Sequence, residues 1–188
     1  MNASLEITAL EAASLINAVR DDLCELVIDA VSDGASVGWV SVPTLSDASL
    51  YWQSVASQVD AGTIVLLVAQ SSEGVIGTVQ LHLSTRPNGA HRGEVARLLV
   101  HTKARRQGIG AKLMSAVEAE GWRRGLSLLI LDTRTDDPSQ RLYEKLGWQL
   151  AGVIPEYARG TSGALQPTSI MYKLGSQDKA LTAPDKTS

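Results

Sequence analysis

Residues 95–114 read VARLLVHTKARRQGIGAKLM, which predicts an apolar strand, a short basic loop with two glycines, and then a helix. The helix is indicated by apolar side chains at helical spacing, namely Ile109, Leu113, Ala116 and Val117. The first N–H groups of such a helix have no partners within it, and the positive end of the helix dipole lies beside them. With Arg105 and Arg106 adjacent, these donors predict a site for a di- or triphosphate.

Several kinds of loop share a Gly-x-Gly sequence. A dinucleotide-binding fingerprint requires a third glycine where Leu113 stands, and a Walker A loop requires Gly-Lys-Ser/Thr, which residues 110–112 do not supply. An ordinary strand-to-helix turn with solvated basic side chains would explain a lone Gly-x-Gly. The pattern that fits in full is Arg-x-x-Gly-x-Gly over residues 105–110, behind an apolar strand that ends at Val100.

This pattern resembles the acetyl-coenzyme A (acetyl-CoA) site of the GCN5-related N-acetyltransferases, the GNAT superfamily. Residues 141–148, RLYEKLGW, resemble that family's Leu-Tyr-x-x-x-Gly-Phe motif at the expected distance. In the family, the loop binds the pyrophosphate of acetyl-CoA and the preceding strand pairs with its pantetheine arm. The resemblance therefore implies cofactor contacts from Leu98, Leu99, Val100, Arg105, Arg106, Gln107, Gly108, Ile109, Gly110, Ala111 and Ser139. Two positions depart from the family, because Asp136 and Ser139 stand where relatives usually carry Asn and Ala.

Shorter segments between Gly34 and Leu174 resemble the tabtoxin-resistance acetyltransferases, which acetylate the free amine of a small amino-acid-like toxin. These segments include GASVG at 34–38, RGEV at 92–95 and QPTSI at 166–170. The resemblance implies transfer of the acetyl group of acetyl-CoA to the primary amine of a small, amino-acid-like molecule in a resistance role. Two alternatives remain: a degenerate domain that binds acetyl-CoA as a sensor, and a protein or peptide N-acetyltransferase.

The composition suits one soluble domain. The chain has 188 residues, 44% hydrophobic content and a net charge of −3, so no overall field attracts nucleic acid or an anionic membrane. No apolar run reaches the about 18 residues that span a bilayer. We expect a cytoplasmic enzyme, a monomer or homodimer, with no nucleic-acid or membrane partner. Cys24 is the single cysteine, and the three histidines lack metal-ligand spacing, so no metal site is expected.

The apolar patterning predicts strands and helices in an order that resembles the GNAT fold. The resemblance implies a mixed α+β fold with a single twisted, mostly antiparallel sheet of six to seven strands flanked by helices. The predicted strands are 5–10, 63–70, 75–84, 94–100, 126–133, 148–153 and 168–174. The predicted helices are 11–31, 46–60 with Ser46 or Asp47 as the N-cap, 109–121 and 138–146. Residues 1–175 form one domain in this interpretation, and 176–188 form a disordered tail.

The reaction needs a base for the ammonium group and an acid for the leaving thiolate. The tabtoxin-resistance resemblance implies Glu94 and Asp132 as bases, and the tyrosine motif implies Tyr143 as the acid. The simpler alternatives are a surface ion pair, a turn cap and a core tyrosine. Burial should raise the pKa of Asp132, whereas nearby arginines should hold that of Glu94 low. The backbone N–H groups of residues 98–100 are expected to face the acetyl carbonyl, and the expected substrate-binding residues are Trp39, Arg92 and Tyr157.

Overall fold

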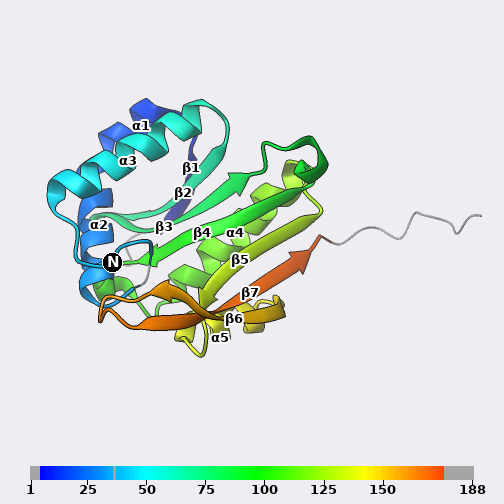
Figure 1. The fold of residues 1–188 in the computed structure, drawn as a ribbon. Coiled ribbons are helices and arrows are strands. Elements are labelled where there is room, and N and C mark those ends of the chain that lie inside the picture. The colour runs from blue at the N-terminus through cyan, green and yellow to red at the C-terminus, as the bar shows by residue number, and fades with distance from the viewer. Residues whose placement is uncertain (1–4, 36, 176–188) are drawn as a thin grey trace, which may run out of the picture.

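The computed structural model describes residues 5–35 and 37–175, which form one seven-stranded sheet with helices on both faces (Figure 1). The strand order is β1-β2-β3-β4-β5-β7-β6. Every neighbouring pair is antiparallel except β4 and β5, which run parallel. The predicted α+β class and its mostly antiparallel sheet are confirmed. The tail predicted at 176–188 lies outside the described residues.

The predicted strands and helices are present with shifted ends, except that the helix predicted over 11–31 is divided in two. The strands are β1 (Glu6–Leu10), β2 (Ile64–Ser71), β3 (Gly74–Leu83), β4 (Arg92–Val100), β5 (Leu128–Arg134), β6 (Gln149–Arg159) and β7 (Leu165–Leu174). The α-helices are α1 (Ala13–Ala18), α2 (Arg20–Ser32), α3 (Leu45–Asp60), α4 (Ile109–Arg123) and α5 (Pro138–Lys145). Two short 3-10 turns are η1 (Pro87–Gly89) and η2 (Thr102–Ala104).

Strand β2 is buried on both faces, as its continuous apolar run predicts. Its even-numbered residues from Ile64 to Val68 belong to the core cluster of α1, α2 and α3. Its odd-numbered residues from Val65 to Ala69 belong to the cluster around α4, which also includes residues of α5 and β5. Because successive side chains of a strand point to opposite faces, this one strand connects both layers of the core.

The helix predicted over 11–31 is two helices. The chain turns at Val19, whose φ of −116° and ψ of 19° are not helical. Helix α1 contacts β1 and α3, whereas α2 continues to β3 and β4. The apolar spacing continues through the turn and no Gly or Pro marks it, so the change of direction follows from packing on the sheet.

The N-cap of helix α3 is Thr44, two or three residues before the predicted caps Ser46 and Asp47. The Thr44 hydroxyl accepts a hydrogen bond from Asp47 N at 3.2 Å, and the Asp47 carboxylate accepts one from Thr44 N at 3.1 Å. This reciprocal capping box satisfies two donors at the helix start. Asp47 therefore takes part in the cap from the third helical position.

Thr44→Ala is expected to lower the free energy of unfolding by about 1 kcal/mol, because it removes the side-chain half of the capping box. Ser46→Ala is the matched control, since Ser46 lies in the same turn and is exposed. Urea denaturation of both variants measures the difference. Equal losses in the two variants would show that the cap contributes nothing specific.

Two features of β4 shape the centre of the molecule. The strand pairs with β5 only over residues 92–94, after which the two strands separate. It also carries a bulge towards β3, where Arg97 and Leu98 lie opposite Val79 alone. Arg97 has a φ of 54°, a conformation that non-glycine residues seldom adopt. The separation of β4 from β5 opens the sheet beside this bulge.

The last two strands form a longer hairpin than predicted. Tyr157 was expected in the connecting loop but lies within β6, where it is 52% exposed. The pairing with β7 extends to Arg159 opposite Leu165 and carries an irregularity between Ile154 and Ala158. The sequence prediction ended β6 early and began β7 late, because the polar and glycine residues between them resemble a loop.

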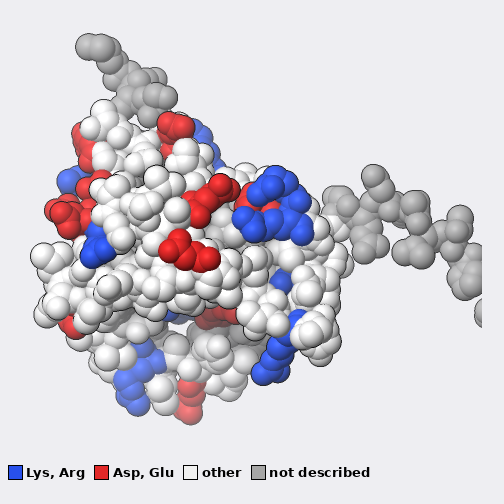
Figure 2. Space-filling view, turned by 90° about the horizontal axis from the view of Figure 1, so that it is seen from above, with Lys and Arg blue, Asp and Glu red and all other residues white. Residues whose placement is uncertain are grey.

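None of the described helices is long and apolar enough to cross a membrane. On the face shown in Figure 2, Lys and Arg side chains lie next to Asp and Glu side chains. Neither sign forms one extended surface in that view.

Candidate active site

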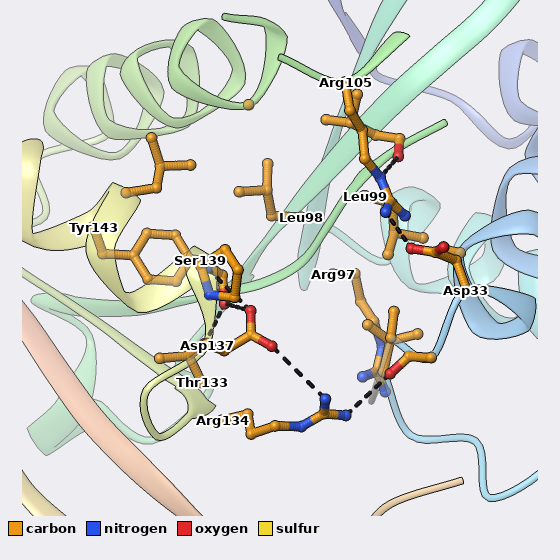
Figure 3. Close-up of a pocket in the computed structure, with 18 of the residues that line it drawn as sticks. Asp33, Arg97, Leu98, Leu99, Arg105, Thr133, Arg134, Asp137, Ser139 and Tyr143 are labelled. Carbon is orange, nitrogen blue, oxygen red and sulfur yellow. Dashed lines mark hydrogen bonds and ion pairs between the residues drawn. The ribbon is translucent and has the colours of Figure 1, made fainter. Parts of the chain in front are cut away.

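A cavity of about 800 Å³ lies where β4 and β5 separate (Figure 3). Its walls come from β4, β5, the start of α4, α5, the loop after α2 and the start of β7. The predicted site residues that line it are Asp132, Tyr143, Leu98, Leu99, Val100, Arg105, Arg106, Gly108, Ile109, Gly110, Ala111 and Ser139. Segments from distant parts of the sequence therefore meet at this opening in the sheet.

Gly108 is the N-cap of α4 and has a φ of 78°. A Cβ at this position would meet no atom within 4 Å, so it would extend into open space in front of the helix. Glycine both permits the left-handed conformation and leaves the first N–H groups of α4 accessible. The arrangement fits the pyrophosphate of acetyl-CoA, which Arg106 and the helix start would hold.

Arg105 connects the loop before α4 to two other parts of the chain. Its side chain forms an ion pair with Asp33 at the end of α2. Its Nε also donates to the carbonyl oxygen of Val100 at 3.1 Å. Because these partners already engage its guanidinium, Arg105 mainly positions the loop. Arg106, which is also exposed, lies beside it.

Tyr143 extends from α5 into the cavity, with 7% of its surface exposed (Figure 3). Burial, followed by the negative charges of Asp137 and Asp132, raises the pKa of its hydroxyl well above the usual value. The hydroxyl therefore keeps its proton at neutral pH. It is available as a hydrogen-bond or proton donor within the cavity.

Ser139 lies at the start of α5, one turn before Tyr143. Its hydroxyl donates to Asp137 Oδ1 at 2.8 Å and lies 2.8 Å from Thr133 Oγ1. Asp137 also caps α5 by accepting from the backbone N–H of Ser139 at 3.0 Å. These bonds join the start of α5 to β5. Asp136, where relatives usually carry Asn, is exposed and does not line the cavity.

Glu94 and Asp132 lie on the same face of the sheet. Glu94 pairs with Ile130 across the β4–β5 ladder, and Asp132 is two residues further along β5. Partial burial, followed by the charge of Asp132, raises the pKa of Glu94 above its usual range, against smaller opposing effects of Arg97 and Arg92. The low pKa expected for Glu94 is therefore wrong, because the two arginines do not outweigh burial and the second carboxylate. The burial expected for Asp132 is also wrong, since its side chain is exposed in the open cavity.

Five predicted residues do not line the cavity, Glu94 among them, although the charge of the lining residue Asp132 acts on Glu94. Gln107 lines a separate hollow with His101 and Lys112. Trp39 packs edge-on against Tyr51, with ring centres 6.3 Å apart, beside the core of α1–α3. The remaining two, Arg92 and Tyr157, are exposed at the start of β4 and within β6.

The structure adds cavity residues that the sequence interpretation missed. The charged ones are Asp33, Arg97, Arg134 and Asp137. Arg134 follows the predicted 126–133 strand, and its place two residues after Asp132 puts it on the same face. That spacing was a usable signal. Arg97 depends on the bulge in β4, for which the sequence carries no local signal.

Among residues 5–35 and 37–175, no three His, Cys, Asp or Glu side chains come together in a way that could hold a metal ion.

The cavity thus combines an accessible helix start, which suits a phosphate group, with a parallel strand pair that separates beside it. The sequence matches the acetyltransferase (GNAT) family over residues 39–148, more than half of its length, and the chain belongs to that family. Family membership makes it an acetyl-CoA-dependent acyltransferase.

The chain is 32% identical over 115 residues to an uncharacterised N-acetyltransferase of the hisH-hisA intergenic region of Azospirillum brasilense, covering 60% of this chain and 67% of that protein. Two solved structures share its fold. A ribosomal-protein-alanine N-acetyltransferase from Brucella melitensis has a TM-score of 0.73 at 19% identity, over 91% of this chain and 99% of that one. A putative acetyltransferase from Salmonella typhimurium, solved with acetyl-CoA, has a TM-score of 0.73 at 17% identity, over both chains entirely.

Proposed function

We propose that the protein transfers the acetyl group of acetyl-CoA to the primary amine of a small, amino-acid-like molecule. The observation that carries this proposal is that two further segments of the chain line the cavity beside β4 and β5. Residues of the loop after α2, including Gly34 and Val37, line one side, and Gln166 to Thr168 at the start of β7 line another. Walls on both sides favour a compact acceptor over an extended peptide.

When bound, acetyl-CoA supplies a thioester whose acetyl group goes to the amine and whose sulfur leaves as a thiolate. In the proposed site, Glu94 and Asp132 accept the ammonium proton, directly or through water. A base is needed because an alkyl ammonium has a pKa near about 10.4. The raised pKa of Glu94 brings it closer to neutral pH, where a general base is most effective.

On the other side of the proposed site are hydrogen-bond donors for the acetyl oxygen and a proton donor for the leaving sulfur. Residues 98–100 of β4 have no ladder partner on β5, so their backbone there is free to face the acetyl oxygen. Such donors typically contribute about 3 kcal/mol each when water is excluded. Tyr143 gives its proton to the departing sulfur, and Ser139 lies beside it at the start of α5.

Two other functions make different predictions. A protein or peptide N-acetyltransferase, as the name of the Brucella protein describes, would acetylate peptides faster than free small amines. A sensor domain would bind acetyl-CoA without turnover, although it would have no use for a base and an acid beside the cofactor.

The test is an acetylation screen that measures thiol release from acetyl-CoA with amino acids, polyamines and peptides as acceptors. We expect turnover with one or more small amines and little with peptides. Preference for peptides would overturn the small-molecule acceptor. Cofactor binding without turnover on any acceptor would favour the sensor function.

Gly108→Val is expected to weaken acetyl-CoA binding by about 10- to 100-fold, because the side chain would exclude phosphate from charge-assisted backbone bonds. Gly125→Val is the matched control. Gly125 has a φ of 80°, its Cβ also would meet nothing within 4 Å, and it lies at the other end of α4. Calorimetry compares the two affinities. Equal weakening in both variants would attribute the loss to backbone strain.

A further inference from the structure

Arg97 is held in a fixed position beside the acceptor end of the cavity. Its guanidinium carbon lies 6.0 Å from the centre of the Tyr51 ring, a distance that suits a cation–π contact. On its other side is Gly38, where a Cβ would lie only 2.8 Å from an Arg97 guanidinium nitrogen. Gly38 has a φ of 88°, a conformation that favours glycine, and the absence of a side chain there leaves room for the guanidinium. The side chain is thereby held between the loop after α2 and helix α3.

Arg134 approaches the same end of the cavity from β5. In Figure 3 the side chains of Arg97 and Arg134 extend from two strands towards one region. Arg134 donates to the carbonyl oxygen of Gly34 at 3.0 Å, so the Gly34–Gly38 loop contacts both arginines. The Nε of Arg134 is buried without a hydrogen-bond partner among the described residues.

The positive charges of these arginines are only partly balanced within the described part of the chain. No carboxylate there forms an ion pair with Arg97, and Arg134 reaches Asp137 only at 3.7 Å. Arg97 lies close enough to Glu94 for its charge to act on that carboxyl group. An incompletely paired guanidinium in a walled cavity is a site for an anionic group, because it offers up to five donors in a planar fork.

The acceptor end of the site thus offers both signs of charge. Asp132 and Arg134 lie on one face of β5, two residues apart, and both line the cavity. Arg97 lies on β4 and also lines the cavity, and Glu94 precedes it in the same strand. The pyrophosphate is expected at Arg106 and the start of α4, so Arg97 and Arg134 have no role in that binding.

We propose that the acceptor is a zwitterion whose carboxylate is held by Arg97 and Arg134 while its amine faces Asp132 and Glu94. This inference rests on the proposed small-molecule N-acetyltransferase function. It makes Arg97 a specificity-determining residue, because an acceptor that lacks the carboxylate would leave this guanidinium unpaired. Arg134 has a smaller share, since Gly34 and Asp137 already engage its guanidinium.

The experiment compares matched acceptors with the wild-type protein. The twenty standard L-amino acids are assayed for thiol release from acetyl-CoA, each beside its carboxamide and its decarboxylated amine. For the accepted amino acids, we expect kcat/KM to exceed that of the uncharged analogues by about 10- to 100-fold, the range of charge-assisted hydrogen bonds. Amide formation also changes the pKa of the amine. Each comparison is therefore made in the pH range where kcat/KM of both acceptors no longer changes with pH.

Arg97→Gln is expected to remove most of this preference, mainly through a higher KM for the acid, while turnover of the carboxamide changes little. Arg97→Lys should retain part of it, and Arg134→Gln should reduce it less. Arg86→Gln is the matched control, because Arg86 is exposed and does not line the cavity. Acetyl-CoA affinity, measured by calorimetry, should be unchanged in all four and verifies that each variant is folded.

The outcomes separate the two proposals. Equal wild-type turnover of acids, amides and amines overturns the carboxylate site but leaves the small-molecule function intact. A preference for acids that survives in both Arg97→Gln and Arg134→Gln overturns the assignment to these residues. No turnover with any small amine, with acetyl-CoA binding retained, overturns the proposed function and the carboxylate site with it.

Discussion

Tyr143→Phe is expected to lower kcat by about 100-fold while leaving acetyl-CoA affinity unchanged. The substitution removes only the hydroxyl, so the packing of the ring against Trp148, with centres 6.3 Å apart, is retained. The loss follows because the departing thiolate would have to take its proton from water, and a general acid contributes typically about 10²–10⁴-fold. Steady-state kinetics with one accepted amine gives kcat, and calorimetry gives the affinity.

Tyr172→Phe is the control for this prediction. Tyr172 lies on β7, donates its hydroxyl proton to Gln149 Oε1 at 2.7 Å and does not line the cavity. Its loss should leave kcat at the wild-type level. Wild-type kcat in Tyr143→Phe would make Tyr143 a packing residue. A loss of affinity together with kcat would indicate that the hydroxyl holds the cofactor.

The decline of activity at alkaline pH provides a second test of Tyr143. Burial and two nearby carboxylates raise the pKa of its hydroxyl, so the protonated form persists to a higher pH than in a free tyrosine. Activity that depends on this proton should therefore not decline at neutral or mildly alkaline pH. A decline there in the wild type that persists in Tyr143→Phe would originate from another group.

The sequence predicted the parts of this fold whose signals are local. Three such parts are present: the strand, loop and helix around Gly108, the doubly buried β2, and the helix that begins at Pro138. Each was predicted from the spacing of apolar residues or from a glycine or proline. The N-cap of α3 was misplaced because Thr44, Ser46 and Asp47 are all good capping residues, and only the three-dimensional hydrogen bonds distinguish them.

The features that the sequence did not reveal depend on strand pairing between distant segments. The charge of Asp132 reaches Glu94 because β5 pairs with β4, and no local pattern gives the strength of that effect relative to Arg92 and Arg97. The position of Arg97 likewise depends on a bulge opposite Val79. A strand sequence with a bulge contains the same apolar residues as a regular strand, so the arginine was counted only as a neighbour of Glu94.

Glu94→Gln is expected to lower kcat/KM by about 10²–10⁴-fold, the range for loss of a general base. In the wild type, kcat/KM should fall as the pH decreases through the pKa of Glu94, because only the ionised carboxylate accepts a proton. Since that pKa is raised, this acid limb should lie above the pH range where carboxyl groups usually titrate. A pH–rate profile with one accepted amine measures it. An acid limb that persists unchanged in Glu94→Gln would originate from another group.

Asp132→Asn distinguishes a shared base from a single one. Removing the Asp132 charge should lower the pKa of Glu94, so the acid limb of kcat/KM should move to lower pH. If both carboxylates accept the proton as a unit, each single substitution is severe and the double variant loses much less than the sum of the two. If Asp132 acts only through its charge, Asp132→Asn shifts the limb and leaves the plateau of kcat/KM nearly unchanged. A double-mutant cycle at the plateau pH separates these cases, and strictly additive losses in activation free energy would rule out the shared base.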